Sequence, residues 1–150
     1  MEKKIDNFLT EKGLPSKEDL FAEFGLFEFS EESDWVVLLL EKLSDKVSTY
    51  IKFLEDMLQP DTNISSMHES LIFTNEERKK MFEILRNLFY WERLSLLIDL
   101  NEEETSKIKY FNDYFKYWKN IKEELKPYLN KAINTWKENE TETKFEGYFG

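Results

Sequence analysis

The chain has 150 residues, of which 35% are charged and 16% are aromatic, and its formal net charge is −10 at pH 7. This excess of negative charge argues against direct binding to nucleic acid, and the absence of cysteine excludes disulfides and thiolate chemistry. With four glycines and three prolines, the sequence lacks the turns that many short strands require, so we expect an all-α fold.

The sequence also predicts a cellular compartment. No run approaches the roughly 18 apolar residues of a membrane span, and the lysines near the N-terminus precede no apolar signal core. We therefore expect a cytoplasmic protein that does not enter a membrane.

Residues 1–33 form an acidic, aromatic segment, which we call the N-terminal arm. Residues 1–34 hold four lysines and ten carboxylates, a net charge of −6, whereas residues 99–138 are balanced. Ser16 is a predicted helix N-cap, and Gly13 and Gly25 are predicted to end short helices. Contacts with a basic protein partner are predicted at Phe21, Phe24, Phe27, Phe29, Glu28, Glu31 and Glu32. The alternative is that the phenylalanines pack on the protein's own helices.

A long amphipathic helix is predicted over residues 34–58, with Ser33 as its N-cap. Its apolar residues recur at spacings of three and four, namely Val36, Leu40, Leu43, Val47, Tyr50, Leu54 and Met57. This stripe predicts burial against neighbouring helices, and Pro60 ends the helix.

Residues 59–73 are predicted to form the longest connection, with a single helical turn that begins at Ser66. The connection holds the only histidine, His68, which we expect on the surface because no catalytic or metal-binding motif surrounds it. A capping box of Thr74 and Glu77 then opens a helix over residues 74–98. Apolar residues spread around most of its circumference, which predicts a central helix.

Glu92 interrupts the apolar face of this helix, where a helical wheel puts it among Leu85, Leu88 and Leu96. A buried carboxylate is costly unless it is paired, so Glu92 marks a candidate pocket or metal site. The alternative is a structural residue that a lysine or a tyrosine hydroxyl from the next helix satisfies.

The last long helix is predicted over residues 102–138. We expect a kink or a break at Pro127, because proline removes a backbone hydrogen bond and crowds the preceding turn. The aromatic run over residues 110–118 either packs in the core or lines an apolar pocket that includes Tyr114. Residues 139–150 are predicted to be a flexible tail, with further candidate partner contacts at Phe145, Tyr148 and Phe149.

These features predict a helical bundle of three long helices with short N-terminal helices, in a single domain over residues 1–138. The leading functional hypothesis is a non-catalytic protein without a cofactor that binds or inhibits a basic protein partner, as antitoxin, immunity or anti-defence proteins do. The alternative is an assembly subunit that self-associates through its helices, for example as a homodimer. The third hypothesis is a small-ligand carrier or an enzyme built around Glu92.

Overall fold

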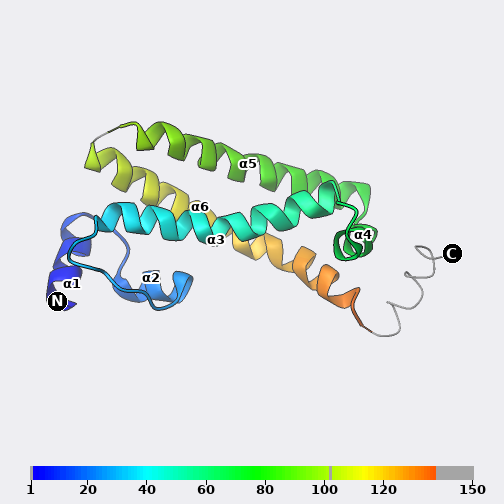
Figure 1. The fold of residues 1–150 in the computed structure, drawn as a ribbon, viewed down its shortest axis with the longest axis horizontal. Helices are drawn as coiled ribbons and strands as arrows, with labels where there is room; N and C mark the ends of the chain where they lie inside the picture. Colours follow the sequence, from blue (N-terminus) through cyan, green and yellow to red (C-terminus); the bar gives the residue numbers. More distant parts are fainter. Residues whose placement is uncertain (1, 102, 138–150) are drawn as a thin grey trace. The chain divides into compact units, whose positions relative to one another are not determined.

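The computed structural model describes residues 2–101 and 103–137. These residues form six helices and no strand (Figure 1), which confirms the all-α prediction. The helices are α1 (Glu2–Glu11), α2 (Lys17–Phe24), α3 (Trp35–Leu58), α4 (Ile64–Ser70), α5 (Asn75–Asp99) and α6 (Glu104–Asn134). The tail with Phe145, Tyr148 and Phe149 lies outside the described residues.

The chain divides into two compact units. The first unit comprises residues 1–48 and 90–118, and the second comprises residues 49–89 and 119–150. The first unit therefore contains α1, α2 and one end of each long helix, and the second contains α4 and the other ends. The single domain over residues 1–138 stays a prediction.

Short-range capping sets the helix boundaries of the first unit. The Ser16 hydroxyl accepts a hydrogen bond from the amide three residues later at 3.1 Å, and Gly25 follows α2 with a φ of 79°, both as predicted. The cap of α3 lies one residue beyond the predicted Ser33, because the Asp34 carboxylate accepts from the Val36 amide at 3.0 Å. A carboxylate at this position also stabilises the positive end of the helix dipole.

The core of the first unit combines apolar side chains of α3 with aromatic rings of α6. Residues that are no more than 1% exposed include Val36, Leu39, Leu43, Val47, Phe111, Tyr114 and Trp118. Burial of one large apolar side chain is worth about 1.5–3 kcal/mol, so this cluster is a main source of stability for the unit. The aromatic run of α6 is therefore largely core.

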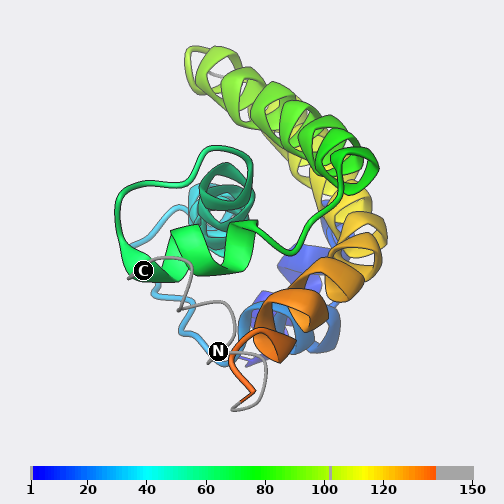
Figure 2. The ribbon, with the colours of Figure 1, turned by 90° about the vertical axis from the view of Figure 1, so that its right-hand side faces the viewer.

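The second unit contains a helix where the sequence predicted a single turn. Helix α4 begins before Ser66 because the Asn63 side chain caps it, accepting from the Ser66 amide at 2.8 Å. The helix lies beside the C-terminal end of α3 (Figures 1 and 2). The Arg78 guanidinium of α5 donates to the Met57 carbonyl at 2.9 Å and also to the Ser70 carbonyl. One side chain thus ties the ends of α3 and α4 to α5.

The predicted surface position of His68 is wrong. Its side chain is 0% exposed, and its Nε2 lies 2.8 Å from the Thr135 carbonyl oxygen. A carbonyl can only accept, so Nε2 carries the hydrogen. The imidazole also lies 4.5 Å from the Trp136 ring, centroid to centroid. His68 therefore holds α4 to the chain that follows α6 in the second unit.

Helix α5 starts as predicted but is not surrounded by protein. The Thr74 and Glu77 side chains form the expected capping box, with hydrogen bonds of 3.0 and 3.2 Å to each other's amides. Only one face is buried, whereas several large apolar side chains are more than half exposed, namely Phe82, Tyr90, Leu96 and Leu97. The prediction of a central helix is therefore wrong.

Helix α6 stays helical through Pro127 and ends at Asn134, so the predicted end at residue 138 is wrong, and of the two alternatives at Pro127 the break is wrong whereas the kink stays a prediction. Pro127 lies on an exposed face, and Glu123, whose carbonyl would have paired with an amide at residue 127, is exposed as well. Water can therefore satisfy the carbonyl that proline leaves without its usual donor.

Candidate functional site

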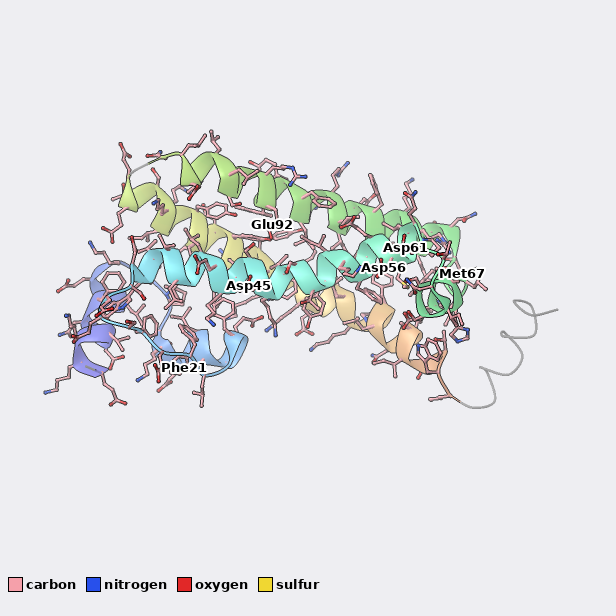
Figure 3. All side chains as sticks on the ribbon, viewed as in Figure 1. Phe21, Asp45, Asp56, Asp61, Met67 and Glu92 are labelled. Atoms are coloured by element: carbon pink, nitrogen blue, oxygen red, sulfur yellow. The ribbon has the colours of Figure 1, made fainter. Side chains whose placement is uncertain are left out.

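Glu92 lies on α5 in the first unit and points toward α3 (Figure 3). The Ser44 hydroxyl of α3 lies 3.1 Å from one carboxylate oxygen and 3.4 Å from the other, so the two oxygens share one donated hydrogen. The partner is a serine and not the predicted lysine or tyrosine. One hydroxyl fills only part of the hydrogen-bonding capacity of a carboxylate.

The surroundings of Glu92 compensate its charge incompletely. Burial raises the pKa of the carboxyl above its ordinary value of 4.5, because removal from water disfavours the charged form. The Ser44 hydrogen bond and the positive charge of Arg93 act in the opposite direction, and the negative charge of Asp45 raises the pKa further. A ligand that donates hydrogen bonds or carries positive charge would therefore stabilise the ionised carboxylate.

A cavity of about 230 Å³ adjoins Glu92 in the first unit. Apolar atoms make up most of its lining, with side chains from α3, α5 and α6. The apolar walls come from Val37, Leu40, Leu43, Leu96 and Ile98, the polar groups from Ser44, Glu92, Ser95, Tyr110 and Tyr114, and the outer charges from Glu41, Asp99 and Lys107. Such a mixture of apolar walls and few polar groups is typical of small-molecule sites.

Tyr114 is the second unusual polar group of the cavity. Its side chain is 1% exposed, and its hydroxyl has no hydrogen-bond partner among the described residues. Burial and the nearby charge of Glu92 both raise its pKa, so the hydroxyl keeps its proton at neutral pH. A buried hydroxyl without a partner costs about 1–3 kcal/mol, so such a group calls for an explanation.

Neighbouring aromatic groups fix the position of Tyr114. The Trp91 ring stacks on it, with 5.2 Å between the ring centroids and 6° between the planes. The other tyrosine of the cavity, Tyr110, differs because its hydroxyl donates to the Trp91 carbonyl at 2.7 Å. The Tyr114 ring therefore packs on Trp91 while its hydroxyl has no partner among the described residues, whereas the hydroxyl of Tyr110 donates to the backbone.

The cavity has no metal-binding character. Among the described residues there is no group of three histidine or carboxylate side chains that could hold a metal ion. The metal-site interpretation of Glu92 therefore has no support in the described part of the chain. Two larger hollows, of about 630 and 450 Å³, are lined mainly by exposed polar and charged side chains such as Lys12, Asp113 and Glu124.

The N-terminal arm packs on the first unit. Phe29 is 5% exposed, and Phe24 contacts the Phe115 ring of α6 with 5.8 Å between centroids. Phe21 on α2 (Figure 3) contacts Phe27 at 5.1 Å, edge to face. The phenylalanines thus follow the intramolecular alternative. None of the predicted arm contacts lines the cavity.

Three carboxylates near the end of the arm lie on the surface. Glu28, Glu31 and Glu32 are exposed, and so is Leu26, at 89%. None of the three glutamates forms an ion pair with another described residue. The predicted partner contacts therefore separate into four packed rings, of which Phe29 is buried and the others are half-buried, and three exposed carboxylates.

Sequence reasoning named Glu92 and Tyr114 as one candidate pocket, and the structure brings both to the same cavity. It missed Ser44 and Lys107. Ser44 had a detectable signal, because it follows Leu40 by four residues and so flanks the apolar stripe of α3. Lys107 had none, since its place at the cavity depends on how α6 packs.

Comparison with protein-family models, with curated proteins and with solved structures gave no match to this chain. In the part of the chain that the structure describes, no helix has the length and apolar character needed to cross a membrane. The cavity beside Glu92 in the first unit is therefore the candidate site.

Proposed function

We propose that this protein binds a small, largely apolar ligand in the cavity beside Glu92. The observation that carries the proposal is the Glu92 carboxylate, which receives only the shared hydrogen of Ser44 and belongs to the lining of a largely apolar cavity. A bound molecule with a polar end that donates hydrogen bonds would fill the remaining hydrogen-bonding capacity of this carboxylate.

The volume limits the size of the ligand. An apolar cavity of roughly 150 Å³ in another protein holds one benzene molecule. By the same ratio, a cavity of about 230 Å³ holds a molecule of roughly nine non-hydrogen atoms. The ligand is thus a small aromatic or branched aliphatic compound, or one end of a longer molecule.

The proposal is for binding without catalysis. The chain has no cysteine, and its single histidine is not among the lining residues. The lining therefore holds two serine hydroxyls but neither a thiol nor an imidazole that could serve as their base. The Glu92 carboxylate is instead suited to orient the polar end of a ligand.

A cavity-filling variant and a matched control test this function. Leu40→Trp adds a large ring to the lining, whereas Leu38→Trp makes the same change on α3 at a half-buried position outside the lining. We expect small aromatic compounds, screened by saturation-transfer NMR, to bind the wild type and Leu38→Trp but not Leu40→Trp. Circular dichroism checks that both variants fold. The proposal fails if no compound binds the wild type, or if Leu40→Trp binds equally well.

A second candidate function is binding of a basic protein partner by the acidic surface of the arm. It is supported by the exposed carboxylates of Glu28, Glu31 and Glu32, which follow the exposed Leu26 along the chain and make no ion pair with other described residues. Apolar anchors within a charged rim suit a partner of opposite charge.

Variants in which glutamates are replaced by neutral glutamines distinguish specific binding by the arm from attraction by the net charge of the protein. We expect a lysine- and leucine-rich helical peptide to bind the wild type at low salt and to lose at least tenfold in affinity in the triple variant Glu28→Gln, Glu31→Gln, Glu32→Gln. The control neutralises three other exposed glutamates, Glu55, Glu76 and Glu83. Equal losses in both variants would mean that only net charge matters, and the arm would have no special role.

A further inference from the structure

Helix α4 of the second unit buries its polar residues and exposes its apolar ones. Its buried residues are Ser66, His68 and Ser70. The apolar residues of the helix and of its C-terminal cap, spaced by three and four, form what we call the α4 stripe: Ile64, 51% exposed, Met67, 36% exposed, and Leu71, 61% exposed. Figure 3 shows Met67 on α4. A surface helix usually has the opposite arrangement, with its apolar residues buried.

Hydrogen bonds hold α4 in this orientation. His68 donates to the Thr135 carbonyl at 2.8 Å. The Arg78 guanidinium of α5 donates to the carbonyl of Ser70. A rotation of α4 that buried the stripe would break these bonds, so the stripe stays exposed. Adjacent apolar side chains on one exposed face are typical of a contact surface, and methionine is common on such surfaces.

The size of the α4 stripe indicates what can cover it. A standard interface between folded proteins takes about 20–30 residues from each side. The stripe offers three apolar side chains on a helix of seven residues. It is therefore too small to hold a folded partner or a second copy of the chain by itself, and it fits a short segment with a few apolar side chains.

We propose that residues 145–149 of the same chain dock on the α4 stripe through their aromatic side chains, Phe145, Tyr148 and Phe149. The described residues end at Lys137, directly after Trp136, whose ring lies 4.5 Å from the His68 ring of α4, centroid to centroid. The eight positions from residue 137 to residue 145 span up to roughly 28 Å, whereas α4 is about 10 Å long. The segment can therefore reach the whole stripe. This contact is independent of the ligand cavity in the first unit.

The covalent connection favours this segment over a peptide from another protein. A short link holds its two ends at an effective concentration on the order of 1 mM, so a contact with a dissociation constant of about 1 mM is half formed without any partner. Charge does not oppose the contact, because residues 143–150 carry one lysine and one glutamate and thus no net side-chain charge.

Methyl NMR of the full chain tests the proposal. In the triple variant Phe145→Ala, Tyr148→Ala, Phe149→Ala, we expect the methyl signals of the α4 stripe to lose the ring-current shifts that docked aromatic side chains cause. The signals of the fully buried Leu54 and Met81 should not move, which shows that the second unit is folded. The control variant replaces other residues of the same terminal segment, and it should leave the stripe signals in place: Glu138→Gln, Glu140→Gln, Glu142→Gln.

A synthetic peptide of residues 143–150 identifies the occupant. It should restore the stripe signals of the triple variant at a concentration on the order of 1 mM and bind the wild type several-fold more weakly, because the chain's own segment competes. Equal binding of the peptide to both proteins, or identical stripe signals in the wild type and the triple variant, overturns the proposal. Stripe signals that move on dilution of the wild type would identify a second copy as the occupant and overturn it as well.

Discussion

Replacement of Trp118 by alanine is expected to lower the free energy of unfolding by about 5 kcal/mol. The side chain is 1% exposed, and its Nε1 donates to the carboxylate of Glu23, which is itself only 7% exposed. Removal of a buried tryptophan ring costs about 3–5 kcal/mol, and a buried carboxylate that loses a donor adds about 1–3 kcal/mol. Because whole domains are stable by about 5–15 kcal/mol, the variant should be close to unfolding.

Urea denaturation followed by circular dichroism measures this effect. Trp118→Phe should lose about 1–3 kcal/mol, because it keeps a large ring but lacks the N–H donor to Glu23. Tyr90→Ala is the control, since Tyr90 is in the same unit and is 62% exposed, and it should change stability by less than about 0.5 kcal/mol. If Trp118→Ala unfolds at the same urea concentration as Tyr90→Ala, the packing described for the first unit is wrong.

The second large effect is expected in the other unit, where His68→Ala should cost about 3 kcal/mol. The imidazole is fully buried, donates to the Thr135 carbonyl at 2.8 Å and packs on the Trp136 ring. Alanine leaves a void in place of the ring and takes the donor from a buried carbonyl. Hydrogen exchange of the α4 amides should also become faster, because His68 contacts Thr135 and Trp136 in the chain that follows α6.

His68→Gln separates the hydrogen bond from the packing. A glutamine amide can reach the position of Nε2, so this variant should recover part of the stability that alanine loses. The matched control is Met67→Ala in the same helix, since Met67 is 36% exposed and should lose much less. Similar stabilities of His68→Ala and Met67→Ala would contradict the buried position of His68.

Local signals in the sequence were sufficient for most of the helices. The apolar stripe of α3, the Ser16 cap and the capping box of Thr74 and Glu77 all act within a few residues, so they are visible without the fold. The errors arose where distant segments meet. His68 contacts Thr135 and Trp136, which lie 67 and 68 positions later, and no pattern in the residues around His68 predicts that contact.

The burial of side chains on helix α5 could not be predicted from its apolar composition. Its apolar residues surround the axis, yet Tyr90, Leu96 and Leu97 are more than 60% exposed. Apolar residues are common on protein surfaces, so an apolar circumference does not prove burial. The polar residue on the same helix was more informative, because a carboxylate at a buried position must be compensated. Glu92 was therefore a candidate for a pocket, a metal site or a structural residue, and the structure adds Ser44 as the group that donates to the carboxylate.

The most direct test of the proposed ligand site is a crystal structure of the protein grown with a small aromatic compound that binds it in solution. We predict electron density for the compound in the cavity of the first unit, with its polar end within hydrogen-bond distance of the Glu92 carboxylate. A well-ordered structure in which the compound lies elsewhere, and the cavity beside Glu92 is closed or holds only water, would contradict the proposed site.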